Sequence, residues 1–328
     1  MRCAFTCGDV NGIGPEIVAK VLSRLSTRAR PSEKILYFAP RNVFHDSADR
    51  LGVAIPHEIV RDRLAVSEDP SVVSVVDLGR ARRAPGKPTK TSGKYAVAAL
   101  EGVVEGLTAG DIDAVVTAPI SKAAACLAGF EFPGHTEFFA ERAGVTEFAM
   151  TFVGKRMKAA LATIHEPLRR VPDLITKESL RRLLDVLVAS LRTDFGVAGP
   201  SVAVLGVNPH AGEGGVIGEE ERETITPVLR EYRGVCEGPF PADAFFARNR
   251  QRDFDMVVGM YHDQALVPFK SIERGTGVNY TAGLPFVRTS PDHGTAYDLS
   301  DKGVADETSL FEAYRLAVAI ARRRRRAQ

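Results

Sequence analysis

Three histidines follow apolar segments of the kind that form buried strands. His165 ends ALATIH, His210 follows VAVLGVNP and His262 follows MVVGMY. If these strands end at one edge of a sheet, the three imidazole rings would converge there. Three neutral imidazoles with one open position form a catalytic site for a divalent metal, commonly zinc. The spacing of the histidines forms no local motif, so their convergence is inferred from equivalent strand positions alone. The alternative is that each ring only forms hydrogen bonds with the backbone of its loop.

A second set of polar residues is typical of anion recognition. GHTE places His135 and Thr136 at the start of a predicted helix, where free backbone N–H groups and a hydroxyl attract phosphate or carboxylate. Lys270, Asn279 and Arg288 follow later, and cations with an amide donor complement a phosphate. The alternative is that Thr136 only caps the helix and that the two cations are solvated.

Several of these residues belong to one polar stretch, 260–295. A core would not collect so many polar groups beside apolar fragments without a use. The predicted strand FDMVVGMY stops at His262, and a short amphipathic turn, QALVPFK, follows. A glycine-rich excursion and an extended segment, LPFVRT, complete the stretch. Polar side chains at strand ends are where α/β proteins place their chemistry.

Two loops have the composition of ligand-binding loops. GDVNGIGPE, residues 8–16, joins a predicted strand to a helix that opens at Pro15. It matches neither GxGxxG nor GxxxxGK[ST], so a standard Rossmann site is not supported. DHGTAYDLSDKGVAD, residues 292–306, is either an irregular connection or a loop that wraps a cofactor.

The elements that must position these residues alternate between strand and helix, which predicts an α/β fold. FAMTFVG and KAALATIH are adjacent candidates for an antiparallel pair. With 328 residues and 45% hydrophobic content, the chain is long for one core. We expect a first lobe of 1–130 with 295–328 and a second of 131–294. The predicted helices include 91–109, 178–193 and 309–324, and the predicted strands include 2–7, 113–119 and 254–261.

The composition excludes several classes of protein. The charges of the 43 basic and 41 acidic residues nearly cancel, which argues against a protein that binds nucleic acids or membranes through its net charge. The run Arg322–Arg326 is either the solvated end of a helix or a short nucleic-acid tail. The four cysteines have no CxxC spacing, which favours a reduced protein. The sequence shows no signal-peptide pattern and no apolar run near ~20 residues, so we expect a cytoplasmic protein outside the membrane. These cysteines are Cys3, Cys7, Cys126 and Cys236.

Taken together, the motifs resemble the 4-hydroxythreonine-4-phosphate dehydrogenase family of vitamin B6 biosynthesis and its paralogues. They follow the family's order from residue 8 to about residue 300: GDVNGIGPEI, VTAPISK, GHTEFFAE, IHEPLRRV, NPHAGEGGVIGEEE, GPFPADAFF, MYHDQALVPFK and GLPFVRTSPDHGTA. The resemblance implies the two-lobed fold of isocitrate and isopropylmalate dehydrogenases, with a cleft between the lobes. It also implies a homodimer with shared active sites, in which the first lobe is the cofactor side and the second carries the metal site, the substrate site and the dimer interface.

The resemblance also implies roles for individual residues. The metal would be held by His165, His210 and His262. We expect zinc, with magnesium or cobalt as alternatives. Candidates for the proton acceptor are Lys270, Asp243 and His135. The phosphorylated substrate would be bound by His135, Thr136, Lys270, Asn279 and Arg288. NAD or NADP would be bound by the adenosine loop HGTAYDLSDKGVA and the first glycine loop, through Gly12, Gly14, His293, Gly294, Thr295 and Asp298.

The implied reaction is oxidation of the C3 hydroxyl of 4-phosphooxy-L-threonine by NAD(P), then loss of carbon dioxide to give 3-amino-2-oxopropyl phosphate. A divalent ion suits this scheme because it stabilises an alkoxide and polarises a ketone. Paralogues that oxidise 4-phospho-D-threonate or 4-phospho-D-erythronate are the alternative. A phosphate acyltransferase or a non-catalytic binding protein fits the polar residues less well.

One motif departs from the family. Its first loop usually reads GDPAGIGPE, whereas this chain has Val10 and Asn11. Because proline fixes φ, its loss predicts a less constrained loop and leaves the cofactor or substrate preference open.

Overall fold

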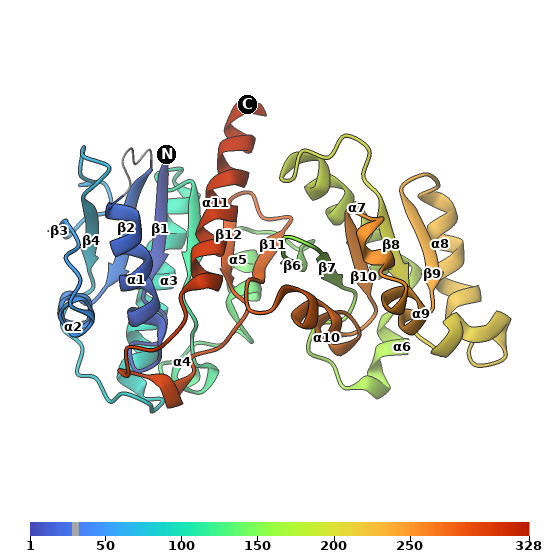
Figure 1. Ribbon diagram of the computed structural model, residues 1–328, viewed down its shortest axis with the longest axis horizontal. Helices are drawn as coiled ribbons and strands as arrows, with labels where there is room; N and C mark the ends of the chain where they lie inside the picture. Colours follow the sequence, from blue (N-terminus) through green and yellow to red (C-terminus); the bar gives the residue numbers. More distant parts are fainter. Residues whose placement is uncertain (28–32, 328) are drawn as a thin grey trace. The chain divides into compact units, whose positions relative to one another are not determined.

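The computed structural model describes residues 1–27 and 33–327, which form two compact units (Figure 1). The first unit comprises Met1–Gly144 and Leu284–Arg326, and the second comprises Val145–Gly283. Both units combine helices with a β-sheet, so the predicted α/β class is confirmed.

The unit boundaries differ from those expected from the sequence. Segments 131–144 and 284–294 belong to the first unit. The reason is packing: Phe139 in the first segment lies edge-on to Phe286 in the second, with ring centroids 5.9 Å apart. The second segment also contains a strand that pairs with the first unit's sheet.

Parallel strands form the sheet of the first unit, in the order β3-β4-β2-β1-β5-β12. β5 is buried throughout, and β1 and β2 are buried except at their first residue, as expected of parallel strands covered on both faces. The bounds are β1 Arg2–Thr6, β2 Lys34–Ala39, β3 His57–Val60, β4 Val73–Asp77, β5 Ala114–Thr117 and β12 Val287–Pro291.

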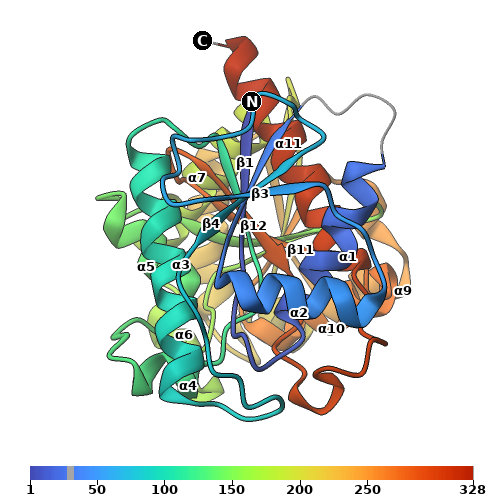
Figure 2. The same ribbon diagram turned by 90° about the vertical axis from the view of Figure 1, so that its left-hand side faces the viewer.

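Helices cover both faces of this sheet. Figure 2 shows α3 on one side of the strands and α1 and α11 on the other. Thr89 caps α3 by accepting a hydrogen bond from the backbone of Ser92, which agrees with the predicted start of this helix. The bounds are α1 Gly14–Ser26, α2 Arg41–Leu51, α3 Lys90–Thr108, α4 Lys122–Leu127, α5 His135–Arg142 and α11 Thr308–Ala327.

The sheet of the second unit is mixed, in the order β11-β6-β7-β10-β8-β9. β6 is antiparallel to β11 and to β7, which confirms the antiparallel pair expected at FAMTFVG and KAALATIH. The other pairs, β7–β10, β10–β8 and β8–β9, are parallel. The bounds are β6 Ala149–Val153, β7 Lys158–Leu161, β8 Val202–Leu205, β9 Cys236–Phe240, β10 Met256–Gly259 and β11 Val278–Ala282.

Two elements of the second unit, the helix α10 and the strand β11, differ from the sequence prediction. The expected short turn QALVPFK lies within α10, a 12-residue helix that tolerates Pro268 in its interior. The expected glycine-rich excursion contains β11, whose Tyr280 is fully buried. The bounds are α6 Val171–Leu174, α7 Lys177–Thr193, α8 Thr226–Glu231, α9 Ala242–Ala247 and α10 His262–Glu273, and a π-helical turn, Glu221–Ile225, precedes α8.

The C-terminal arginines contact the first unit. Arg322 pairs with Glu33, Arg324 donates to the carbonyl oxygen of Leu284 and Arg325 pairs with Asp113. These contacts favour the helix-end interpretation of the run over a nucleic-acid tail. The four cysteines are unpaired. No helix in the described part of the chain is long and apolar enough to cross a membrane.

Glu273 at the end of α10 holds the turn between β6 and β7. Its carboxylate accepts hydrogen bonds from the backbone N–H groups of Lys155 (3.0 Å) and Arg156 (2.8 Å), and only 4% of the residue is exposed. Gly154 is required here, because a Cβ atom would lie 2.2 Å from the Glu273 carboxyl carbon. The Glu273 carboxylate therefore stabilises this turn, and the turn needs glycine at position 154 to leave room for the carboxylate.

We expect Glu273→Ala to lower the free energy of unfolding by about 2–3 kcal/mol, because it leaves two amides without their charged acceptor. Urea denaturation measures this loss. The control is Glu178→Ala, which removes an exposed ion pair with Arg182 and should change stability by less than ~0.5 kcal/mol. Equal losses in the two variants would contradict the assignment.

Candidate functional site

The three predicted metal-binding histidines follow neighbouring strands. β7 pairs in parallel with β10, and β10 pairs in parallel with β8. His165 lies in the turn after β7, His262 begins α10 after β10, and His210 lies in the turn after β8. The carboxyl ends of parallel strands meet at one edge of a sheet, so the three residues lie along the same edge.

Two of these rings lie close together. The ring centroids of His165 and His262 are 5.8 Å apart. Nδ1 of His262 lies 2.7 Å from a carboxylate oxygen of Asp263, a contact that fixes the orientation of a ligating imidazole. Within residues 1–27 and 33–327 of one chain, however, no group of three potential ligands could hold a metal ion. The predicted three-histidine set is therefore incomplete in the single chain.

His210 occupies an unusual backbone turn. Residues 210–214 all have positive φ angles, from 45° to 81°, so they form a short left-handed turn. His210, Ala211 and Glu213 are not glycine, and each such residue costs roughly 1–2 kcal/mol in this conformation. Such strain persists only where surrounding contacts enforce it.

Glu221 provides those contacts. It begins the π-helical turn, is 4% exposed, and accepts hydrogen bonds from the backbone N–H (2.7 Å) and the side-chain amide (3.0 Å) of Asn208. A Cβ atom on Gly212 would lie 2.6 Å from a Glu221 oxygen, so the turn closes directly over this carboxylate. π-Helical turns are frequent at functional sites, and this one fixes the segment that carries His210.

Arg288, the predicted anion-binding arginine, is buried in the first unit with only 2% of its surface exposed. Its guanidinium donates to the hydroxyl of Thr117 at 2.9 and 3.2 Å and to Nδ1 of His135 at 3.0 Å. Burial lowers the pKa of Arg288 to about 9, and the nearby carboxylate of Glu137 opposes this shift. The group remains a cation at neutral pH and is held in the low-dielectric interior.

The contact with Arg288 fixes the protonation of His135. A guanidinium can only donate, so Nδ1 accepts and the proton of the neutral ring lies on Nε2. Burial, and then the charge of Arg288, lower the pKa of His135 well below 6.5. Nε2 is hidden from solvent and has no hydrogen-bond partner in the described protein. The ring is therefore a buried donor beside a cation.

The other predicted substrate-binding residues are distributed over both units. Thr136 is buried in the first turn of α5, and the N-cap is Gly134, so the alternative that Thr136 caps this helix is wrong. Lys270 lies in the last turn of α10, Asn279 lies on β11, and Asp243 lies in the first turn of α9, all in the second unit. Their convergence on the substrate remains a prediction.

The predicted cofactor loop packs against the first glycine loop. The backbone N–H of Ile13 donates to the carbonyl oxygen of Thr295 at 3.0 Å. A Cβ atom on Gly12 would lie 2.8 Å from the same oxygen, so this approach requires glycine. Gly14 is equally confined by the carbonyl oxygen of Cys7 at 2.5 Å. His293, Gly294 and Asp298 belong to the same loop and are partly or fully exposed.

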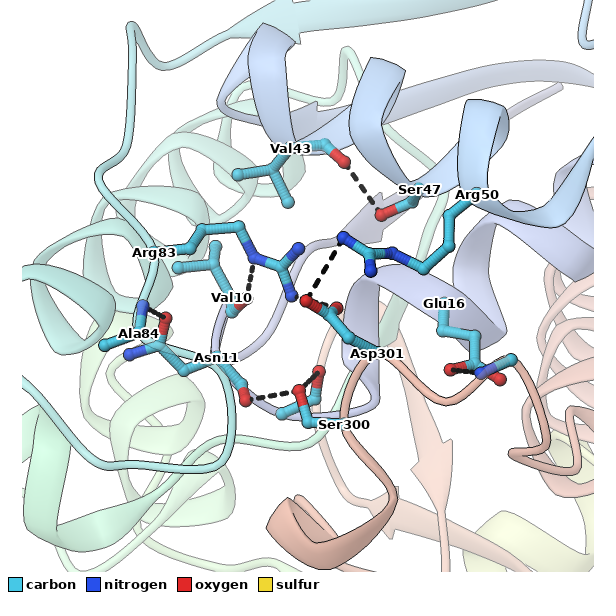
Figure 3. A network of polar contacts seen from close by, with 12 residues as sticks. Val10, Asn11, Glu16, Val43, Ser47, Arg50, Arg83, Ala84, Ser300 and Asp301 are labelled. Atoms are coloured by element: carbon cyan, nitrogen blue, oxygen red, sulfur yellow. Dashed lines mark hydrogen bonds and ion pairs between the residues drawn. The ribbon is translucent and has the colours of Figure 1, made fainter.

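The expectation that Val10 and Asn11 loosen the first loop is wrong. Both residues are fully buried, and the side-chain amide of Asn11 is bonded on its nitrogen to Lys87 and on its oxygen to Ala84. The second of these bonds is drawn in Figure 3. Asp9 is held nearby by the hydroxyls of Ser92 and Tyr297, at 3.0 and 2.8 Å, and burial raises the pKa of its carboxyl. Hydrogen bonds thus replace the constraint that proline would give.

Sequence analysis missed Thr117, Asp263 and Glu221 as parts of the site. Thr117 lies within the motif VTAPISK, and Glu221 ends the motif NPHAGEGGVIGEEE, which also contains His210. The motifs therefore included both residues, but the contacts of Thr117 with Arg288 and of Glu221 with Asn208 leave no signal in the sequence. Asp263 directly follows His262, and that adjacency is a signal that could have indicated an orienting carboxylate.

Comparison with solved structures defines the class of fold. Isocitrate dehydrogenase from Methylococcus capsulatus matches over 99% of this chain and 88% of its own, with 13% identity and a TM-score of 0.51. At this identity the match concerns the fold alone, and it agrees with the predicted isocitrate dehydrogenase-like architecture.

The family follows from closer relatives. Residues 31–317 match the family of the pyridoxal phosphate biosynthetic protein PdxA. A 4-hydroxythreonine-4-phosphate dehydrogenase from Bacteroides thetaiotaomicron is 40% identical over 99% of this chain and 90% of its own. The structure of the same enzyme from Klebsiella pneumoniae is 34% identical, covers 98% of both chains and has a TM-score of 0.85. The chain belongs to the PdxA family, which confirms the resemblance found in its sequence.

The lowered pKa of His135 predicts a pH-dependent stability. Below pH 6.5 the unfolded chain binds a proton at this ring that the folded chain refuses, so stability falls as the pH drops through 6.5. From pH 7.5 to 5.5 we expect wild type to lose about 1.4 kcal/mol more than His135→Gln. Urea denaturation at both pH values measures the difference. The contributions of the other histidines cancel because both proteins contain them. The same pH dependence in both proteins would contradict a neutral, buried ring.

Proposed function

We propose that this protein is an NAD(P)-dependent dehydrogenase of pyridoxal phosphate biosynthesis. It oxidises the C3 hydroxyl of 4-phosphooxy-L-threonine, and the resulting β-keto acid loses carbon dioxide to give 3-amino-2-oxopropyl phosphate. The names of the full-length relatives and of the matching family support this reaction. The observation in this chain that carries the proposal is the buried pair of Arg288 and His135.

This pair suits a phosphate. A guanidinium presents N–H donors in a planar fork that matches phosphate oxygens, and a bound anion would offset the cost of its burial. Nε2 of His135 adds a second kind of donor, because the neutral ring carries its single proton on this buried atom. The backbone N–H groups in the first turn of α5 add positive potential, since Gly134 leaves them without a side-chain cap.

His165, His210 and His262 would hold a divalent metal, with zinc first and magnesium or cobalt as alternatives. Such an ion, when bound, supplies a Lewis acid to an alcohol or ketone oxygen. The chain's own contribution is orientation: Asp263 turns the ring of His262, and Glu221 holds the left-handed turn that carries His210. The 5.8 Å between the rings of His165 and His262 fits a shared ion, and the third ligand must come from elsewhere.

The substrate proton needs an acceptor, and His135 is poorly suited to the role. Its Nδ1 already accepts from Arg288, and its Nε2 carries the ring proton. We therefore assign His135 to binding and retain Lys270 and Asp243 as candidates for the acceptor. The base would take the hydroxyl proton while NAD(P), when bound, would supply the hydride acceptor for C3, and the ketone so formed could accept the electrons of the C–C bond that breaks as carbon dioxide leaves.

A second copy of the chain would complete the metal site. In the described residues one chain does not assemble three ligands. Large apolar side chains are exposed beside the histidines: Val216 follows the turn of His210, and Val267 lies on α10 after His262. A homodimer with shared sites would bury such residues. The unpaired cysteines fit a reducing compartment such as the cytoplasm.

We expect purified protein to reduce NAD or NADP in the presence of 4-phosphooxy-L-threonine, and to lose this activity with a chelator. His210→Ala should lower kcat/KM by at least ~100-fold, because a metal ligand is removed. His45→Ala, an exposed histidine of the first unit, is the matched control. Light scattering of the same sample should give twice the chain mass of 35.5 kDa.

Three outcomes would count against this proposal. Turnover that survives the chelator and His210→Ala would contradict the metal role. Faster turnover of 4-phospho-D-threonate or 4-phospho-D-erythronate, assayed in parallel, would place the chain among the paralogues. A monomeric mass with full activity would contradict the shared site.

Arg288→Lys tests the phosphate assignment. Lysine keeps the charge but loses the planar fork, so we expect kcat/KM for 4-phosphooxy-L-threonine to fall by about 10–100-fold. The value for the dephosphorylated substrate should change by less than ~3-fold. Arg142→Lys, on the exposed side of α5, controls for general effects. Equal losses with both substrates would show that Arg288 does not recognise the phosphate.

A further inference from the structure

The loop 293–305 is fixed at both ends by residues of the N-terminal segment. At its start, Thr295 accepts from the backbone N–H of Ile13. At its end, the carboxylate of Glu16 accepts from the backbone N–H groups of Gly303 (3.2 Å) and Ala305 (2.8 Å). Lys20 donates to the carbonyl oxygens of the same two residues. The loop is therefore anchored to α1 independently of any ligand.

Asn11 connects the centre of this loop to a third segment, residues 84–89. Its side-chain oxygen accepts from the backbone N–H of Ala84 at 2.8 Å. Its side-chain nitrogen donates to the carbonyl oxygen of Lys87 at 2.9 Å and to the hydroxyl of Thr89 at 3.1 Å. Its backbone carbonyl accepts from the hydroxyl of Ser300 at 2.7 Å and from the backbone N–H of Gly86 at 2.8 Å.

The conformation held in this way is strained. Ala296 and Asp301 have φ angles of 40° and 60°, in the left-handed region that disfavours side chains. Asp301 is fixed between two guanidiniums, at 2.6 Å from Arg83 and 3.2 Å from Arg50 (Figure 3). Nε of Arg83 also donates to the carbonyl oxygen of Val10, directly before Asn11. Asn11 thus links the first glycine loop to residues 84–89 and to the strained loop 293–305.

We propose that Asn11 is a positioning residue for the dinucleotide: it holds the loop 293–301 in its binding conformation before the cofactor arrives. The inference rests on the proposed function, which assigns this loop to the dinucleotide. It goes beyond that function by giving a role to the residue at which this chain departs from the family motif. A loop ordered in advance does not lose its freedom on binding, so the dinucleotide binds more tightly.

The test separates dinucleotide binding from the other steps. We expect Asn11→Ala to raise KM for the dinucleotide about tenfold, while kcat changes less than ~3-fold and KM for 4-phosphooxy-L-threonine less than ~2-fold. Titration of NADH fluorescence should give a matching increase in Kd, and the absence of tryptophan in the chain keeps the background low. Asn11→Ala removes the side-chain bonds to residues 84–89, whereas Ser300→Ala removes the bonds from the loop to the backbone carbonyls of Asn11 and Gly12 and should raise both constants about threefold.

Asn42→Ala is the matched control. Asn42 also bonds both of its amide atoms to a backbone, but through the N–H and carbonyl oxygen of Ala81 and not through the segment 84–89 that Asn11 holds. Its loss should therefore cost similar stability in thermal melts and change dinucleotide KM by less than ~2-fold.

The outcomes distinguish this inference from the proposed function. Wild-type protein with neither NADH binding nor turnover overturns both. Active wild type with unchanged dinucleotide constants in folded Asn11→Ala and Ser300→Ala overturns the inference alone. An equal rise in Asn42→Ala overturns it as well, because a general loosening would then explain the effect. If Asn11→Ala does not fold, Ser300→Ala against Asn42→Ala decides in the same way.

Discussion

A guanidinium buried near the start of β12 constrains the packing of the first unit. Arg288 cannot readily shed its charge, so its burial requires partners that accept hydrogen bonds. Thr117 on β5 and His135 at the start of α5 supply them. This requirement fixes the tautomer of His135 and brings β5, β12 and α5 together. In the proposed function, a phosphate bound here would meet donors that folding has already desolvated.

The second unit solves a different problem, which is to aim imidazoles from adjacent strand ends. A parallel arrangement of β7, β10 and β8 delivers the histidines to one edge without any local motif. The final orientation then depends on acidic side chains. Asp263 acts on His262 directly, whereas Glu221 acts on His210 through a left-handed backbone turn. Nearby carboxylates thus constrain how these histidines are oriented.

Sequence patterns predicted the parts of this protein that depend on local periodicity. The α/β class, the antiparallel pair β6–β7 and the exits of β7, β8 and β10 were all accessible, because apolar runs and polar strand ends are visible in the chain. β11 was missed because VNYTA mixes polar and apolar residues, and α10 was shortened because Pro268 suggests a break. The bonds of the Arg288 and Asn11 side chains described above join residues more than 70 positions apart in sequence, and such bonds leave no local signal. Loss of the loop proline predicted freedom, whereas buried hydrogen bonds restored order.

The arginine run at the end of α11 has a consequence for proteolysis. Trypsin cleaves after arginine, and proteases need a stretch of backbone that can leave its secondary structure. By composition, Arg322–Arg326 is the densest set of such bonds in the chain. Yet the run is helical, and its side chains are tied to Glu33, Asp113 and a backbone carbonyl. Limited digestion should therefore trim this end only as fast as the last turns of α11 unwind.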